Sequence, residues 1–164
     1  MKHESLILRE VVDDDLPHFF EHQRDPVANR LAGSSPRDLE TYTEHWSQVA
    51  SNETVLRRTI EVEGAPVGYV ASFLRTEQRE IGYWIARSLW GQGITTRALT
   101  AFLVLERTRP LEARTAKQNL ASLRVLEKCG FVRKGEDVFT NRAGESFEEH
   151  VLVLEAASFG RSGD

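Results

Sequence analysis

The residues with the clearest chemical meaning lie in two segments, residues 81–96 and residues 119–131. In the first segment, Gly91 and Gly93 flank one residue where a predicted strand gives way to a predicted helix. Glycine permits positive φ and a close approach of the backbone. The first N–H groups of a helix have no internal partner, and the helix dipole adds positive charge there. The segment therefore predicts an anion site suited to a pyrophosphate.

The predicted donors at this site are main-chain amides, helped by two threonine hydroxyls. They belong to Gly91, Gln92, Gly93, Ile94, Thr95 and Thr96. A single G-x-G is an ordinary turn in most sequences, so that alternative stays open. Two other phosphate motifs are absent, because the sequence has neither G-x-x-x-x-G-K-[ST] nor the third glycine of a dinucleotide fingerprint.

The strand expected before these glycines, over residues 80–86, can hold an extended arm. If it splays from its neighbour, its amides and carbonyls can pair with a pantetheine chain, as in β-augmentation. An amide near Trp84 or Ile85 would then face a thioester oxygen and stabilise an oxyanion. The alternative is that Tyr83 and Trp84 are packed sheet residues. Both interpretations can hold, because they use different atoms.

The second segment supplies side chains that suit a thiol-bearing ligand. Asn119 stands at the N-cap of a predicted helix, three residues before Ser122, and its amide can also contact a pantetheine arm. The Ser122 hydroxyl can point at the thiol sulfur and protonate the departing thiolate, while Arg124 can reach a CoA phosphate. The alternatives are a plain cap, a solvated serine and a surface arginine. Cys129 has the apolar setting of an inert thiol. Together the segments predict an acyl-CoA-dependent transferase.

The two patterns, W-G-x-G-x-x-T and N-x-x-S-x-x-x-L-E-K-x-G-F, together resemble the GNAT superfamily of N-acetyltransferases. Within it, they look most similar to the RimJ/RimL-like ribosomal-protein alanine N-acetyltransferase group. Leu6–Arg9, Asp13–Asp15 and Ile81–Trp84 share the resemblance, which spans residues 6–154. It implies acetyl-CoA as the donor and a primary amine as the acceptor, on a protein N-terminus or a small molecule.

The resemblance also implies roles for particular positions. It assigns the pantetheine-facing strand to Trp84, Ile85 and Ala86, the pyrophosphate loop to residues 91–96, a pantetheine contact to Asn119 and the proton donor to Ser122. The chain departs from many members at two places. Ser88 stands where Gln or Arg is common, and Leu126 stands where a tyrosine acts as general acid. The tyrosine mechanism is therefore excluded, which makes Ser122 the candidate.

Direct attack on the thioester requires a neutral amine, so a base must take the proton of the amine. Glu80, on the strand beside the expected thioester, is the first candidate, and a solvated strand glutamate is an equal alternative. The other candidates are Glu21, His22, Glu148, Glu149 and His150. His18 and His22 lie four residues apart, but no H-E-x-x-H motif is present, so no metal site is expected.

These residues require a scaffold of strands and helices. Hydrophobic periodicity predicts strands over residues 6–11, 55–61, 67–73, 79–86 and 111–115, another from Phe131, and a last one over residues 150–154. It predicts helices over residues 16–24, from Ser35 onwards, and over residues 94–107 and 120–129, with acidic caps at residues 13–15. Residues 139–149 are expected to form a loop that contributes to acceptor choice.

The order β-α-α-β-β-β-α-β-α-β-β predicts an α/β (α+β) three-layer sandwich. The GNAT resemblance implies a mixed, mostly antiparallel sheet with helices on both faces and a splayed central strand pair. With 164 residues and no linker, the chain is expected to form a single N-acetyltransferase domain over residues 1–164. Residues 158–164 are expected to be a frayed tail.

Composition bounds the remaining functions. A net charge of -4 gives no general attraction to nucleic acid, and no apolar run is long enough to span a membrane. The one cysteine predicts a reducing, cytoplasmic setting. The oligomeric state is a separate question, and a homodimer is possible. The main alternative function is an acetyl-CoA-binding sensor or regulatory module of the same fold without turnover. The missing P-loop lysine argues against a nucleotide-binding module.

Overall fold

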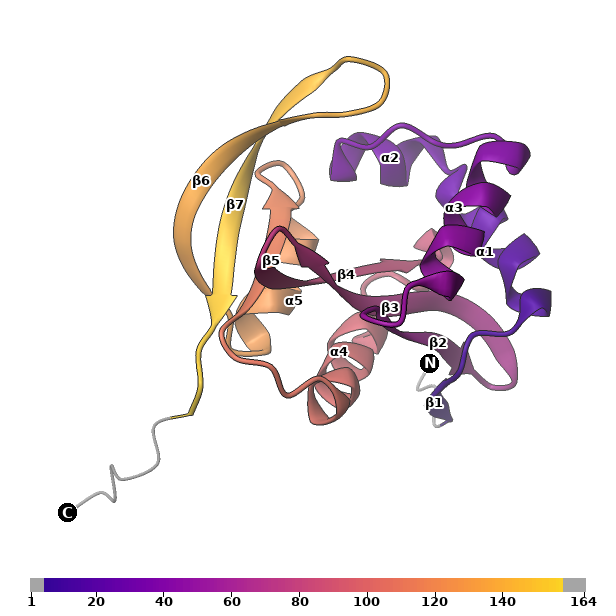
Figure 1. Ribbon diagram of the computed structural model, residues 1–164, viewed down its shortest axis with the longest axis horizontal. Coiled ribbons are helices and arrows are strands. Elements are labelled where there is room, and N and C mark those ends of the chain that lie inside the picture. Colours follow the sequence, from indigo (N-terminus) through magenta and orange to yellow (C-terminus); the bar gives the residue numbers. More distant parts are fainter. Residues whose placement is uncertain (1–4, 158–164) are drawn as a thin grey trace.

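The computed structural model describes residues 5–157, so the expected frayed tail at residues 158–164 lies outside the described residues. A seven-stranded sheet of order β1-β2-β3-β4-β5-β7-β6 runs through the molecule (Figure 1). Neighbouring strands are antiparallel except β4 and β5, which are parallel. The strands are β1 (Leu6–Arg9), β2 (Leu56–Val62), β3 (Ala65–Arg75), β4 (Gln78–Ile85), β5 (Leu111–Ala116), β6 (Val132–Thr140) and β7 (Ser146–Leu154). The predicted mixed, mostly antiparallel sheet is confirmed.

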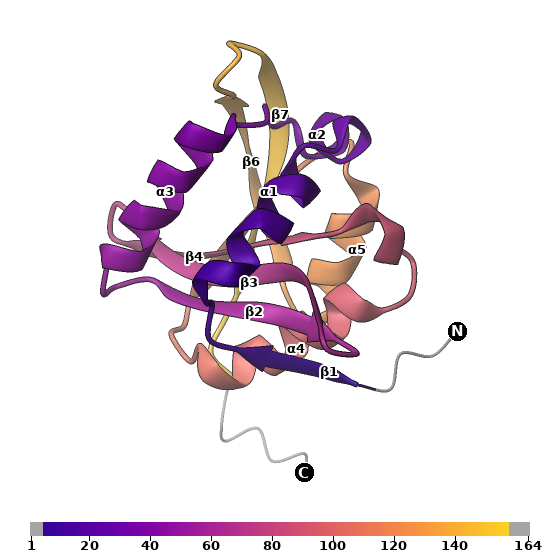
Figure 2. The ribbon, with the colours of Figure 1, turned by 90° about the vertical axis from the view of Figure 1, so that its right-hand side faces the viewer.

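Helices cover both faces of this sheet, as predicted. Figure 2 shows α1 (Leu16–Gln23), α2 (Pro26–Ala32) and α3 (Leu39–Ser51) on one side and α4 (Ile94–Leu105) on the other. The fifth helix, α5 (Leu120–Lys128), shares the main core with α4. Short 3₁₀ turns cover Asp13–Asp15 and Arg87–Leu89.

A separate core lies on each face. The main core includes the fully buried side chains of Ile60, Phe102, Leu111, Leu126 and Leu152. On the opposite face, Phe19 packs with Tyr42 and Trp46, and the Phe19 and Trp46 ring centroids are 5.3 Å apart. The sheet therefore presents one face to α4 and α5 and the other to α1 and α3. Among residues 5–157, no helix is long and apolar enough to cross a membrane.

The helical region before β2 differs from the prediction. The helix expected from Ser35 begins at Leu39, because the Asp38 carboxylate caps it by accepting a hydrogen bond from the Thr41 amide at 2.8 Å. An additional helix, α2, lies between the two expected ones. Its signals were a capping aspartate, Asp25, followed by Pro26 at the first helical position.

The acidic run before α1 does not cap that helix with its side chains. The Asp15 carboxylate instead accepts hydrogen bonds from the Arg9 guanidinium at 2.8 Å, the Val12 amide at 3.0 Å and the Thr59 hydroxyl at 2.7 Å. Burial works to raise the pKa of Asp15, but these hydrogen bonds outweigh it and lower the pKa to about 2. The buried ion pair ties the start of α1 to β1 and β2.

The loop expected over residues 139–149 is wrong. Most of that stretch belongs to the β6–β7 hairpin, in which Phe139 lies opposite Phe147 with ring centroids 5.6 Å apart. The turn is short, and the Asn141 side chain donates a hydrogen bond to the Gly33 carbonyl at 3.1 Å. The hairpin therefore curves over the end of α2 (Figure 1).

The contact between β4 and β5 is brief. Only two residue pairs, Glu80 with Glu112 and Ile81 with Ala113, are in register between these strands. Beyond Ile81 the two strands part, which confirms the predicted splayed central pair.

Candidate active site

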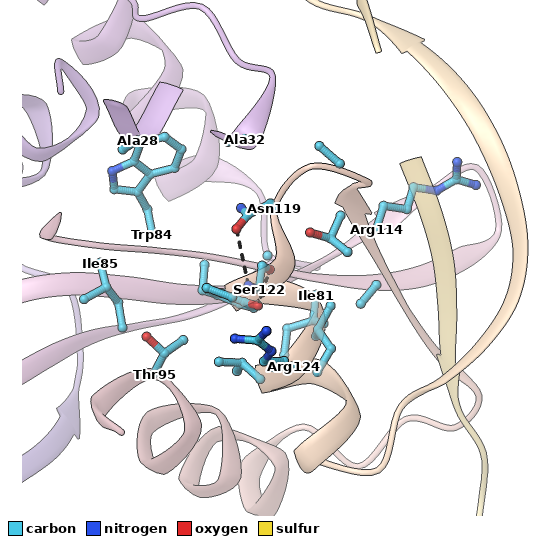
Figure 3. Close-up of a pocket in the computed structure, with 18 of the residues that line it drawn as sticks. Ala28, Ala32, Ile81, Trp84, Ile85, Thr95, Arg114, Asn119, Ser122 and Arg124 are labelled. Carbon is cyan, nitrogen blue, oxygen red and sulfur yellow. Dashed lines mark hydrogen bonds between the residues drawn. The ribbon is translucent and has the colours of Figure 1, made fainter. Parts of the chain in front are cut away.

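The parting of β4 and β5 opens a cleft of about 750 Å³ between the two halves of the sheet (Figure 3). This volume lies within the range of small-molecule and cofactor sites. Residues from both predicted segments line it, including Gly91, Gly93, Asn119, Ser122 and Arg124. The structure thus brings the two segments together around one cavity.

One end of the cleft is the N-terminus of α4. Gly91 and Gly93 both adopt positive φ, at 77° and 75°, and Gly93 is the N-cap of α4. The Arg97 amide makes the first intrahelical hydrogen bond, to the Gly93 carbonyl at 3.1 Å. The three preceding amides, of Ile94, Thr95 and Thr96, therefore point out of the helix end toward any anion placed there. The local geometry is the one that the G-x-G segment predicts.

The β4 edge of the cleft offers fewer main-chain donors than the sequence predicts. The Ala86 amide donates to the Val67 carbonyl of β3 at 2.9 Å, so it is not a donor to a pantetheine arm. Alternation along a strand then directs the amides of Tyr83 and Ile85 away from β3 and toward the cleft. The Ile85 carbonyl already accepts a hydrogen bond from the Trp90 indole at 3.1 Å.

Side chains alternate between the two faces of β4. Ile81, Tyr83 and Ile85 pack against the main core on the face of α4 and α5. Glu80 and Trp84 consequently face the side of α1 and α2. The Trp84 indole donates to the His22 carbonyl at 3.1 Å, and Figure 3 shows its ring reaching toward Ala28 of α2.

Asn119 has two usable groups. Its Oδ1 accepts a hydrogen bond from the Ser122 amide at 3.3 Å, so the predicted cap is present. Its Nδ2 remains the group that can donate to a ligand in the cleft. Figure 3 shows Asn119 and Ser122 facing the cavity from the start of α5, with Arg124 close by on the same helix.

Ser122 has a partner that the sequence analysis missed. The Ser122 Oγ lies 2.7 Å from the Tyr83 hydroxyl. Burial raises the pKa of Tyr83 to about 12, although the hydrogen bond between Tyr83 and Ser122 works in the opposite direction. Alternation along β4 predicts only that Tyr83 shares the face of α5 with Ile81 and Ile85. Sequence spacing alone gave no hint that Tyr83 and Ser122 meet.

Cys129 is half-buried near Thr96 and Thr100. Burial raises the pKa of its thiol, which disfavours the reactive thiolate. This agrees with an inert cysteine.

Glu80 faces the cleft rather than solvent. It lines the cavity and is only 4% exposed. The Arg75 Nε lies 2.9 Å from the Glu80 Oε2, but it is not aligned to donate a hydrogen bond to that oxygen. Burial raises the pKa of the Glu80 carboxyl, and the charges of Arg75 and Arg114 oppose part of this shift.

Among the other candidate bases, Glu149 is the one that lines the cavity. It is 6% exposed and accepts a hydrogen bond from Arg114 at 2.9 Å. Glu21 forms a surface pair with Arg24, and Glu148 is exposed beside Lys117. His22 and His150 are half-buried outside the cavity lining. The structure therefore gathers Glu80 and Glu149 and leaves the rest outside.

Arg114 organises the acidic side of the cleft. Its guanidinium donates to Glu112 at 2.9 Å, to Asp137 at 3.0 Å and to Glu149 at 2.9 Å. Arg114 thus holds three carboxylates and Glu80 lies beside Arg75, so the buried acidic side chains that line this end of the cleft, Glu80 and Glu149, each have an arginine next to them. In residues 5–157, no group of three or more His, Cys, Asp or Glu side chains could hold a metal ion.

The chain matches a protein family by sequence and several solved structures by fold. A family model described as the acetyltransferase (GNAT) domain matches residues 5–132. The structure of AAC(6')-Ib in complex with an aminoglycoside and acetyl-CoA has a TM-score of 0.78 and 22% identity, covering 98% of this chain and 99% of that chain. The microcin C7 self-immunity acetyltransferase MccE, in complex with acetyl-CoA and AMP, has a TM-score of 0.77 and 16% identity, covering 93% of each chain.

A GNAT-family acetyltransferase from Bacillus anthracis has a TM-score of 0.75 and 19% identity, covering 94% of this chain and 96% of that chain. At such identities the solved structures establish a shared fold. No curated protein sequence matches the chain.

Proposed function

The chain belongs to the GNAT family of acetyltransferases, whose model matches residues 5–132, and on this premise we propose that it acetylates a primary amine. The donor is acetyl-CoA, and the amine attacks the thioester directly. One observation carries the proposal: the cleft between β4 and β5 has the Ser122 hydroxyl on the α5 side and the buried Glu80 carboxylate on the other face of the sheet. Direct transfer is accelerated by a proton acceptor within reach of the amine and a proton donor within reach of the sulfur.

The binding role of the cleft follows its shape. The amides at the start of α4, with the hydroxyls of Thr95 and Thr96, suit the pyrophosphate of CoA. The amides of Tyr83 and Ile85 and the Asn119 Nδ2 suit the pantetheine arm, and Arg124 suits a phosphate at the mouth of the cleft. A thioester held at the parting of the strands presents its carbonyl to a β4 amide, which stabilises the developing oxyanion.

Two side chains then move protons. Glu80 takes a proton from the incoming ammonium, and its raised pKa brings it closer to the pKa of an effective base at neutral pH. Ser122 gives a proton to the thiolate as the bond between the acetyl carbon and sulfur breaks. The products are the acetylated amine and CoA, and no acyl-enzyme forms.

The acceptor end favours a cationic amine. Glu80 and Glu149 are buried carboxylates on its floor, while Ala28, Ala32 and Phe139 supply apolar walls. Such a site suits an ammonium group carried on a small molecule or on a protein N-terminus, the latter being the acceptor that the RimJ/RimL-like resemblance favours. The single cysteine is consistent with action in the cytoplasm.

Titration calorimetry with acetyl-CoA, followed by thiol release against a panel of amines and N-terminal peptides, tests this function. We expect micromolar binding and turnover on at least one cationic acceptor. Binding without turnover on any amine would favour an acetyl-CoA sensor. Absence of binding would contradict the assignment of the α4 N-terminus to pyrophosphate.

A further inference from the structure

The Tyr83 side chain brings a hydroxyl into the cleft that the reaction above does not use. Its oxygen lies 2.7 Å from the Ser122 Oγ, so one hydrogen bond joins β4 to α5 across the cavity wall. Both residues line the cleft. The Tyr83 ring packs against the main core on the same β4 face as Ile81 and Ile85, so the phenol is held in place.

The acidity of the two hydroxyls decides the direction of this hydrogen bond. A phenol is more acidic than an aliphatic alcohol, so Tyr83 is the better donor and the Ser122 oxygen the better acceptor. Burial raises the pKa of Tyr83 to about 12, so the phenol keeps its proton at neutral pH. With Tyr83 donating, the proton of Ser122 is free to point into the cleft.

A serine alone is a poor acid for a departing thiolate. Its hydroxyl is much less acidic than a thiol, so giving up the proton would leave an alkoxide. A second hydroxyl that protonates the serine oxygen at the same moment avoids that alkoxide. Among residues 5–157, the Tyr83 phenol is the hydroxyl hydrogen-bonded to the Ser122 Oγ.

We propose that Tyr83 and Ser122 form a two-hydroxyl relay that protonates the leaving thiolate, an inference that rests on the proposed acetyl transfer. As the bond between the acetyl carbon and sulfur breaks, its electron pair stays on sulfur, which takes the Ser122 proton. The Ser122 oxygen takes the phenol proton of Tyr83. The phenolate then regains a proton from water, and Glu80 releases the proton that it took from the amine to water, so that no proton is gained or lost over the cycle. Tyr83 is thus a positioning residue that acts through Ser122.

Steady-state kinetics of Tyr83→Phe, Ser122→Ala and the double variant test the relay. The Tyr83→Phe change removes only the hydroxyl, and we expect kcat to fall roughly tenfold with the KM for acetyl-CoA unchanged. Ser122→Ala should lower kcat by roughly 10²-fold. The double variant should match Ser122→Ala, because Tyr83 has no separate route to sulfur. The matched control is Tyr42→Phe, which removes another buried tyrosine hydroxyl outside the cleft lining and should keep the wild-type kcat.

Three kinetic outcomes would overturn the relay. The first is an unchanged kcat in Tyr83→Phe. The second is a double variant in which the two single losses multiply, since the residues would then act independently. The third is a Ser122→Ala variant that keeps its rate while Tyr83→Phe loses it, since Tyr83 would then be the direct donor.

Binding of CoA alone separates this inference from the proposed function. The pKa of the bound thiol can be followed by the NMR shift of an isotope-labelled methylene carbon next to sulfur. Hydrogen-bond donation to the thiolate lowers this pKa, so Tyr83→Phe should raise it by about half a unit to one unit. An equal thiol pKa in both proteins would refute the relay even in an active enzyme. The expected difference without turnover on any amine would instead refute the proposed function.

Discussion

The two ends of the cleft differ in the groups that would contact a ligand, which are main-chain amides at one end and side chains at the other. At the CoA end, the proposed contacts come mainly from main-chain amides at the start of α4 and along the parted edge of β4. At the acceptor end they come from side chains, with Glu80, Arg114 and Glu149 contributed by three different strands, β4, β5 and β7. Main-chain donors recognise the part that every CoA thioester shares. Side chains can change while the backbone stays the same, so we expect the acceptor end to determine specificity.

The largest effect we expect comes from the acceptor end. Replacing Glu80 by Gln removes the proposed base and should lower kcat by roughly 10²- to 10⁴-fold, while the affinity for acetyl-CoA stays close to wild type. Calorimetry for binding and thiol release for turnover measure the two quantities separately. Glu77→Gln, an exposed glutamate in the β3–β4 turn, is the control and should behave as wild type.

The pH profile sharpens the same test. Burial raises the pKa of Glu80 above its ordinary value of 4.5, and a base works only when deprotonated. Activity of the wild type should therefore fall as the pH drops through this raised pKa, and the limb should vanish from the residual activity of Glu80→Gln. A loss of acetyl-CoA affinity in that variant would mean that the two ends of the cleft are not separable.

The same contrast explains what the sequence can predict. The CoA end consists of local signals, a glycine pair before α4 and a capping asparagine before α5, and both have the predicted geometry. The sequence does not show which face of the sheet the Glu80 side chain takes, because that depends on which β4 side chains α4 and α5 cover. The pairing of Arg114 with Glu149 and of Tyr83 with Ser122 depends on contacts between distant segments. Spacing along the chain carries no information about such contacts.

The differences between the predicted and observed helix boundaries also depend on local signals. A serine followed by a proline indicated a helix start at Ser35. The helix instead begins at Leu39, because the carboxylate of the preceding residue, Asp38, caps it by accepting a hydrogen bond from a helix amide. The aspartate and proline that open α2 are equally local signals, and they are sufficient to predict its start. The β6–β7 hairpin was harder to predict, since nearly all of β6 is exposed and lacks the alternation of a half-buried strand.

A smaller effect should come from straining the CoA end. Gly93 has φ 75°, and a Cβ at this position would meet no atom within 4 Å, so Gly93→Val acts through backbone strain alone. A β-branched residue disfavours this conformation, and the α4 amides should shift. We expect acetyl-CoA affinity to weaken roughly 10- to 100-fold, as measured by calorimetry, with the KM for the amine unchanged.

The matched control is Gly144→Val in the β6–β7 turn. Gly144 has φ 84° and an equally open Cβ position, but it lies away from the CoA loop. Its substitution should cost similar strain without weakening acetyl-CoA binding. Equal losses of affinity in both variants would point to general destabilisation rather than to a cradle at α4.

On the side of the sheet that carries α1, stability should depend on the buried charge of Asp15. Asp15→Asn breaks the ion pair that ties α1 to the sheet, and we expect the free energy of unfolding to fall by about 2 kcal/mol at neutral pH. Because the folded pKa of Asp15 is lowered from 3.8 to about 2, its stabilisation is complete above pH 3.8 and is lost as the pH falls through about 2. Urea unfolding at neutral and acidic pH should show the two proteins converging in acid. A constant difference would contradict the titration of Asp15.

The smallest effect we expect concerns Asn119 at the CoA end. Its side chain has one group that stabilises α5 and another that is proposed to bind the ligand. The Asn119 Oδ1 caps α5, whereas Nδ2 is the proposed donor to pantetheine. Asn119→Asp keeps the capping oxygen and removes the donor, so its free energy of unfolding should match wild type while acetyl-CoA affinity falls about fivefold. Asn119→Ala loses both groups and should also lose about 1 kcal/mol of unfolding free energy. Urea unfolding and calorimetry on the two variants decide the point: if Asn119→Asp binds acetyl-CoA as well as wild type, Asn119 is a cap alone. The CoA end would then rest on main-chain donors to an even greater degree.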